Sequence, residues 1–353
     1  MSMHNDSDRG TDNAPASPDD LLPAVQPPSA GFLLQLFLIP LLIVSVIVLV
    51  WLMFSWLASA GSDPRELVRD LKKLNNSSWQ KAVSLANQLQ DPQYDSLKDD
   101  GTLAKELAEV LDAELAAGKT DSARLMLRIY LCRILGEFRV GDGLPALMKA
   151  AAQEKAKEEV DVRASALESL AILIKNLGPE KMQESDPLRQ VLLDCSSAVP
   201  ASGGDDDAYA EVRSRAAFAL GVMGGEEAVS RLEQMLADAY PNARYNAAVG
   251  LARQGDIRCS KVLLEMLDPQ NSEVVKSEQL ESNREAKRLS VLVNGLRAAE
   301  VLLLKQPATG DVAEFDAVRA AVVKLSEASE PKAVPIVARD VLQNLTPAKA
   351  GKS

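Results

Sequence analysis

Two stretches of this 353-residue chain share one pattern: residues 212–238 read VRSRAAFALGVMGGEEAVSRLEQMLAD, and residues 243–269 read ARYNAAVGLARQGDIRCSKVLLEMLDP. At an offset of 31 residues they coincide at eight of 27 positions, where ordinary composition gives about one or two. The identical pairs are Arg213/Arg244, Ala216/Ala247, Ala217/Ala248, Leu220/Leu251, Gly224/Gly255, Leu232/Leu263, Met235/Met266 and Leu236/Leu267. The chain therefore contains an internal repeat, which indicates stacked structural units.

Each unit is predicted to be a hairpin of two helices. From Val212 to Met223 apolar residues recur every three or four positions, which is the spacing of one helical face. Gly224, and Gly255 in the second unit, are predicted to end these helices in a left-handed turn. Because so short a hairpin cannot bury its apolar face alone, neighbouring units must stack. We therefore predict an all-α fold in which residues 61–345 form a solenoid of stacked helical hairpins.

Three arginines mark the same position of successive units. Arg163, Arg213 and Arg244 each follow an acidic or amide residue and then valine or alanine, with looser versions at Arg124 and Arg319. A phosphate or ligand site is one interpretation of this series. We favour a structural role, in which each guanidinium pairs with nearby acids and its aliphatic stem covers a neighbouring helix.

The run EVRSRAAFALGVMG at residues 211–224 resembles the HEAT repeats of bacterial proteins, including the HEAT-like repeats of phycobilisome lyases. The resemblance is specific over residues 211–268 and weaker over 120–178. It implies an α-solenoid whose arginines and acidic residues recur along the turns. It also implies an alternative function, that of a lyase-like enzyme or enzyme subunit.

A long uncharged segment precedes the repeats. Residues 32–60 contain no charged side chain, and the run FLLQLFLIPLLIVSVIVLVWLMFSWL covers residues 32–57. As a helix this run spans about 39 Å, more than the roughly 30 Å hydrocarbon core of a bilayer. A cleaved signal peptide would need a basic start and a shorter apolar run. We therefore predict a transmembrane helix at 32–60, contacting the membrane through residues 32–57.

The flanks of this segment predict its orientation. The 31 residues before it hold five aspartates, five prolines and a single basic residue, Arg9, and are predicted to be disordered, as is the C-terminal segment 346–353. Basic residues follow the segment at Arg65, Arg69, Lys72, Lys73 and Lys81. The positive-inside rule then places the C-terminal side in the cytoplasm, so we expect a single-pass protein of the inner or cell membrane.

Composition excludes several classes of chemistry. A net charge of −11 opposes binding of nucleic acid, whose phosphates recruit Lys and Arg. The one histidine, His4, lies in the acidic tail, which removes a Ser–His–Asp triad and most metal sites. Cys132, Cys195 and Cys259 stand far apart and are interpreted as buried thiols. No catalytic residue, cofactor site or metal site is predicted.

Two further features call for an interpretation. Residues 195–209, CSSAVPASGGDDDAY, are predicted to be a surface insertion between stacked units. A calcium site at Asp205, Asp206 and Asp207 is the alternative, but consecutive aspartates point in different directions. Trp79 opens an amphipathic helix after a polar run. It is interpreted as packing on the open end of the solenoid, with an exposed anchor for a partner as the alternative.

These observations favour a membrane-anchored helical-repeat scaffold. Solenoids present extended surfaces, and this chain lacks recognisable catalytic motifs, so we expect a protein that is not an enzyme and that binds protein partners of unknown identity through its solenoid surface. The lyase-like alternative would need an aromatic-rich pocket. Only 4% of the residues are aromatic, which weighs against it.

Overall fold

The computed structural model describes residues 29–59, 64–73, 77–154, 156–199, 207–276, 278, 280–306, 312–329 and 331–346. Most of the predicted tail at 1–31, the centre of the predicted insertion at 195–209 and nearly all of the segment 346–353 lie outside these residues. The chain divides into two compact units, Met1–Ser62 and Asp63–Ser353.

The described part of the first unit is one helix, α1 (Ala30–Ser59), with Pro40 inside it. Its large apolar side chains are exposed, from 45% of the surface for Val48 to 71% for Phe37. The 21 residues Leu34–Phe54 would span about 32 Å at 1.5 Å per residue. Helix α1 is therefore long and apolar enough to cross a membrane, at the place where the sequence predicts such a helix.

The described part of the second unit is built from helices and contains no strand, which confirms the predicted all-α fold. Its α-helices are α2 (Pro64–Leu71), α3 (Ser78–Gln90), α4 (Gly101–Ala117), α5 (Ser122–Gly136), α6 (Leu144–Ala152), α7 (Val160–Leu177), α8 (Pro179–Gln183), α9 (Asp186–Ser196), α10 (Asp207–Met223), α11 (Glu226–Met235), α12 (Pro241–Gln254), α13 (Ser260–Met266), α14 (Glu281–Leu304), α15 (Val312–Ser326) and α16 (Ala333–Leu345). Short 3₁₀ helices are η2 (Pro92–Asp99), η3 (Gly141–Gly143), η4 (Lys157–Glu159), η5 (Ile257–Cys259) and η6 (Glu273–Val275).

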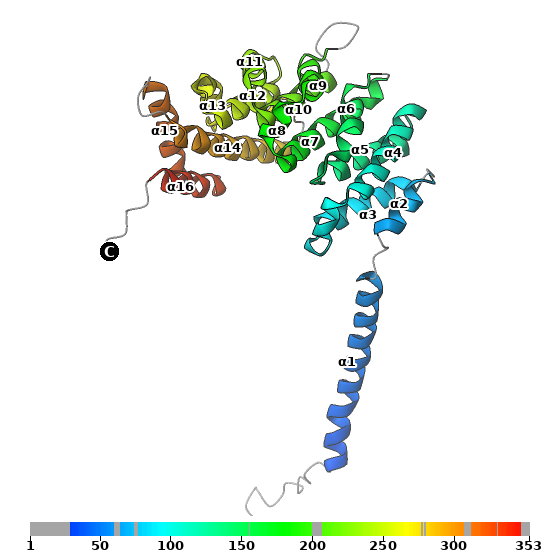
Figure 1. The fold of residues 1–353 in the computed structure, drawn as a ribbon. Helices are drawn as coiled ribbons and strands as arrows, with labels where there is room; N and C mark the ends of the chain where they lie inside the picture. Colours follow the sequence, from blue (N-terminus) through cyan, green and yellow to red (C-terminus); the bar gives the residue numbers. More distant parts are fainter. Residues whose placement is uncertain are drawn as a thin grey trace, which may run out of the picture. The chain divides into compact units, whose positions relative to one another are not determined.

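The helices of the second unit form two layers (Figure 1). In the first layer α3, α5, α7, α10, α12, α14 and α16 each pack against the next. In the second layer α4 packs on α6, α6 on α9, α9 on α11, and α13 on α15. Because the chain alternates between the layers, successive helices form hairpins such as α10–α11 and α12–α13. This is the stacked arrangement that the repeat predicts.

One hydrophobic core runs between the layers from Leu67 to Val341. The stripe predicted for α10 belongs to it, since Val212, Ala216 and Leu220 are fully buried. The stripe of α11 points into the same core through Leu232, which is also fully buried. Burial of one apolar face in each helix is therefore what holds the stacked units together.

Two predicted glycines stand where α10 and α12 end. Gly224 follows α10 with φ of 69°, and Gly255 follows α12 with φ of 78°. Both values lie in the left-handed region, where a side chain is strained and glycine is not. Each glycine turns the chain from the first layer into the second.

The segment between α9 and α10 is shorter than the sequence predicts. Residues 195–196 form the end of α9, and residues 207–209 begin α10. Cys195 is buried in the core at 2% exposure, so the apolar pattern of α9 extends further than the polar composition of the segment suggested. The aspartates of the alternative calcium site lie at or outside the edge of the described residues.

Candidate functional site

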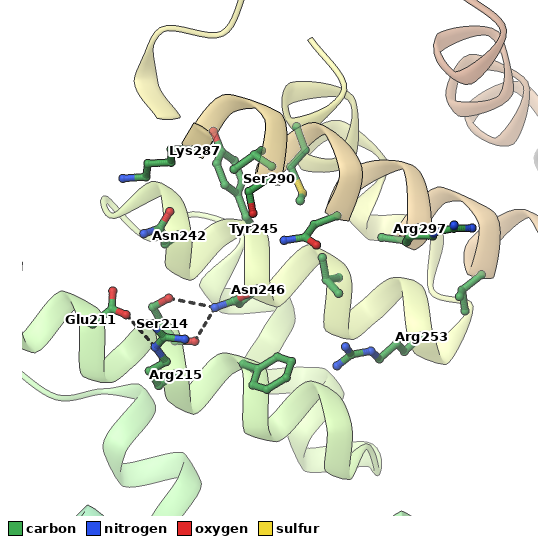
Figure 2. A pocket seen from close by; sticks show the side chains of 17 residues that line it. Glu211, Ser214, Arg215, Asn242, Tyr245, Asn246, Arg253, Lys287, Ser290 and Arg297 are labelled. Carbon is green, nitrogen blue, oxygen red and sulfur yellow. Dashed lines mark hydrogen bonds and ion pairs between the residues drawn. The ribbon is translucent and has the colours of Figure 1, made fainter. Parts of the chain in front are cut away.

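A groove of about 500 Å³ lies on the first layer of the second unit. Its wall comes from one face of each of three successive helices: Glu211–Phe218 on α10, Asn242–Arg253 on α12 and Lys287–Val301 on α14, with Met266 of α13. Within each helix the lining residues recur every three or four positions, which places them on a single face. Figure 2 shows these side chains around the groove.

An asparagine ties two of the helices together within the groove. The Asn246 side-chain amide on α12 donates to the Ser214 carbonyl oxygen and to the Ser214 Oγ on α10, each at 3.0 Å (Figure 2). Asn246 stands at the repeat position that Arg215 occupies in the preceding unit. The two units therefore present different polar groups to the same groove.

Four basic side chains line the groove: Arg215, Arg253, Lys287 and Arg297. Three of them have carboxylate partners at ion-pair distance. The pairs are Arg215 with Glu211 at 2.7 Å, Lys287 with Glu278 at 3.0 Å, and Arg297 with Glu300 at 3.0 Å and Asp340 at 2.9 Å. These three charges are thus largely compensated within the protein.

Arg253 differs from the other three. Its Nη1 is buried without a hydrogen-bond partner, and no carboxylate of the described residues lies within ion-pair distance of it. Its guanidinium carbon lies 5.3 Å from the centroid of the Phe218 ring, and this cation–π contact compensates the charge only in part. Desolvation lowers the pKa of Arg253 below its ordinary value. The groove therefore contains a partly dehydrated cation that has no anionic partner among the described residues.

The repeat arginines predicted from the sequence lie elsewhere, at the turns. Arg213 Nε and Nη2 donate to the two carboxylate oxygens of Asp238 at 2.9 and 3.2 Å, and Nη1 donates to the Ala198 carbonyl at 3.0 Å. Arg244 Nη1 donates to the Asp238 carbonyl at 3.0 Å, and its Nη2 donates to Glu265 at 2.8 Å. The Asp238 turn therefore contacts the arginines of two successive units.

Arg163 follows the same rule one unit earlier. Its Nε donates to the Ala151 carbonyl at 3.1 Å, and its Nη1 lies 3.5 Å from the Glu154 carboxylate. In all three cases an arginine in a first-layer helix donates to a carbonyl in the last turn of the preceding second-layer helix, or two or three residues after that helix ends. Carbonyls at a helix end lack the partner that the next turn would provide, so the arginines supply one.

The structure places Arg128 in the same role, which the sequence pattern missed. Arg128 is fully buried, pairs with Glu159 at 2.5 Å and donates to the Lys119 carbonyl after α4. Arg124, the looser match in the sequence, pairs instead with Glu114 at 2.7 Å. Arg128 follows methionine and leucine. It therefore lacks the acidic or amide residue that, two positions earlier, marks the other arginines in the sequence.

Trp79 lies in the first turn of α3 and packs, half-buried, against the hydrophobic core. This contact is the one expected of a side chain that covers an end of the solenoid. The remaining exposed part leaves the alternative, an anchor for a partner, as a prediction.

The described residues include no histidine, and no three of their His, Cys, Asp or Glu side chains are grouped to hold a metal ion. Burial raises the pKa of Cys132 and of Cys259 to about 12 and also raises that of Cys195. These thiols stay protonated at neutral pH, and a protonated thiol is a poor nucleophile. In the groove itself, the described residues offer charged and amide side chains, and Arg253 is the cation there to which an anionic group could pair.

Comparison with known proteins identifies the class of fold. The second unit is an all-α repeat solenoid, and residues 205–282 match the family model for HEAT repeats. The predicted HEAT-like repeats are thus confirmed for this part of the chain. No curated protein sequence matches the chain.

Among solved structures, the chain is similar to that of human deoxyhypusine hydroxylase in complex with glycerol. The TM-score is 0.27 and the identity 17%, over 80% of this chain and 95% of that one. That protein is an enzyme with HEAT repeats. The expectation that the present chain is not an enzyme is corrected accordingly: it relied on the repeat architecture and on the lack of recognisable catalytic motifs, and neither excludes catalysis.

Proposed function

We propose that the protein is a membrane-anchored scaffold that binds protein partners through the surface of its helical repeats. One observation carries this proposal: an apolar helix with exposed side chains is joined to a second unit that has a hydrophobic core of its own. The first unit is thus suited to lipid surroundings and the second to water, which supports an anchor joined to a soluble repeat domain.

The exposure of α1 supports anchoring. A helix that is apolar on all sides has no polar face to show to water, so it is stable only inside a protein core or a bilayer. Within the described residues α1 packs against no other helix of its own unit. A bilayer is an environment in which such a helix would be stable.

Charge asymmetry supports the orientation. Five basic residues lie within about 20 residues after the apolar run, against Arg9 alone before it. Some of them also stabilise the second unit, as Lys72 does through its ion pair with Glu106 at 3.1 Å. The repeats would then face the cytoplasm.

The groove supports partner binding. It crosses α10, α12 and α14 and exposes polar, apolar and charged groups side by side. Protein interfaces use this mixture, with an apolar centre and polar groups that fix the orientation.

Affinity purification tests the proposal directly. The baits are the full chain, residues 61–353, and residues 1–62 fused to an unrelated soluble domain, each isolated from detergent-solubilised membranes or from the soluble fraction. We expect the first two baits to retain a common set of proteins that the third does not. A set retained only by residues 1–62, or no reproducible set, would contradict the scaffold.

A further inference from the structure

We propose that the groove across α10, α12 and α14 binds an extended peptide segment of a partner, with an aspartate or glutamate of that segment paired to Arg253. The inference rests on the proposed function and adds the chemistry of the partner to it. It comes from three features of the groove: its uncompensated cation, the side-chain oxygen of Asn246 with the amide of Asn294, and its length.

The cation selects a carboxylate. Arg253 is partly dehydrated by burial, and its Nη1 has no hydrogen-bond partner among the described residues. The folded protein is therefore destabilised by the desolvation free energy of this unpaired donor. A carboxylate in the groove would supply an opposite charge close to the guanidinium, and an acceptor for the part of the guanidinium that lines the groove. The other three cations of the groove, Arg215, Lys287 and Arg297, already have carboxylate partners. Arg253 is thus the groove cation that a carboxylate of a ligand would pair with.

The amide groups select a peptide. Asn246 donates through its nitrogen to Ser214, and its Oδ1 accepts no hydrogen bond from the described residues. Asn294, across the groove on α14, is exposed and has no hydrogen-bond partner among these residues. The Asn246 oxygen can accept from a peptide N–H, and the Asn294 amide can both donate to a peptide carbonyl and accept from a peptide N–H. Phe218, Val249 and Val301 add apolar surface for the intervening side chains.

The charge balance disfavours a polyanion such as a nucleic acid. The chain carries a net charge of −11, and acidic residues accompany the other three cations of the groove. A row of phosphates would meet these carboxylates along most of its length. A peptide with one acidic side chain would place its charge at Arg253 alone.

The length of the groove fixes the length of the segment. Neighbouring helix axes in packed layers lie about 8–10 Å apart, so a path across three helices covers about 20 Å. An extended chain covers about 3.3–3.6 Å per residue, so about six residues fit.

Fluorescence polarisation with labelled peptide pools tests the inference on the full chain in detergent micelles. Each pool contains capped hexapeptides with one fixed central residue, either glutamate, glutamine or lysine, and uncharged residues elsewhere. We expect the glutamate pool to bind about tenfold more tightly than the glutamine pool, because its hydrogen bond to Arg253 is charge-assisted. The lysine pool should bind most weakly.

Two variants locate the effect. Arg253→Gln should remove the preference for glutamate and lower the melting temperature only slightly, since the Arg253 side chain loses a cation–π contact with Phe218 but no ion pair or hydrogen bond to the described residues. Arg133→Gln is the matched control, because Arg133 also lies over an aromatic ring, that of Tyr130 at 5.2 Å, but outside the groove. Arg133→Gln should keep the preference.

Several results would overturn the inference. They are equal binding of the glutamate and glutamine pools, a preference that survives in Arg253→Gln, no binding of any pool, or complete competition by inorganic phosphate or by a short RNA. None of them affects the purification experiment. Partners retained by residues 61–353 together with such a result would keep the scaffold and reject this groove as its peptide site.

Discussion

Gly221 of α10 and Gly250 of α12 meet backbone to backbone. A Cβ atom on Gly221 would lie 2.6 Å from Gly250 Cα, and one on Gly250 would lie 2.8 Å from Gly221 Cα. Such distances leave no room for a side chain on either residue. The close approach of α10 and α12, on which two walls of the groove stand, therefore depends on this glycine pair.

Gly221→Ala should destabilise the second unit by about 1–3 kcal/mol, because the added methyl group forces α10 and α12 apart. Urea unfolding of residues 61–353, followed by helical circular dichroism, measures the change. Gly141→Ala is the control, since its Cβ would meet only Leu177 Cδ1 at 3.9 Å, and it should change stability by less than about 0.5 kcal/mol. Equal effects of the two substitutions would contradict this account of the helix contact.

Arg213→Ala should cost about 1–3 kcal/mol, because it leaves Asp238 and the Ala198 carbonyl without their donor and removes the packing of the aliphatic stem. Arg258→Ala, which breaks a cluster with the half-exposed Glu233 and with Asp256, should cost less than about 1 kcal/mol. Urea melts of the same fragment compare the two. If Arg213→Ala left stability unchanged but abolished the retention of partners, the residue would belong to a binding site.

The three thiols should be unreactive in the folded protein. With Ellman's reagent at pH 8 we expect no modification of the native chain and modification of three cysteines in urea, since Cys132, Cys195 and Cys259 are buried. The folded state raises the pKa of Cys132 from 9.0 to about 12 and so favours the protonated thiol. The resulting stabilisation is complete below pH 9 and declines as the pH rises toward 12. Rapid native labelling of Cys132 would show that the core opens locally.

The full chain should stay with membranes after washing with alkaline carbonate, whereas residues 61–353 should be soluble alone. The reason is the exposed apolar surface of α1, which water does not solvate well. Fractionation and immunoblotting measure the distribution. A released mature protein that begins at Gly61 would replace the anchor with a signal peptide.

Protease added to intact spheroplasts should spare residues 61–353, because the basic residues after α1 favour the cytoplasm for the repeats. Digestion after lysis is the control that shows the sites to be cleavable. Cleavage of the second unit before lysis would reverse the orientation.

The sequence predicts those features of the repeat that depend on residues close together in the chain. The stripe from Val212 to Met223 and the positive φ of Gly224 and Gly255 follow from helical period and backbone sterics, which are local. The contact between Gly221 and Gly250 was missed because the two are not equivalent in the repeat, since an offset of 31 residues places Gly221 opposite Ala252. Their contact depends on how two helices cross, which no local pattern reports.

The groove escaped sequence analysis for a related reason. Arg253 and Asn294 lie 41 residues apart and belong to different units, and only stacking brings α12 and α14 together. A partial signal existed: Asn242, Asn246, Val249 and Arg253 recur at spacings of four, three and four on α12. That series identifies a second face of α12, opposite to the buried one. It does not identify the residues of α14 that lie next to this face.

The turn at Asp238 serves two units at once, its carboxylate bound by Arg213 and its carbonyl by Arg244. A loop elsewhere could lengthen at little thermodynamic cost, since closure entropy rises only slowly with length. An added or lost residue at this turn would instead move an oxygen away from one arginine or the other. The array can therefore grow or shrink here only by whole hairpins, each of which must bring an arginine for the turn before it and an acceptor for the hairpin that follows.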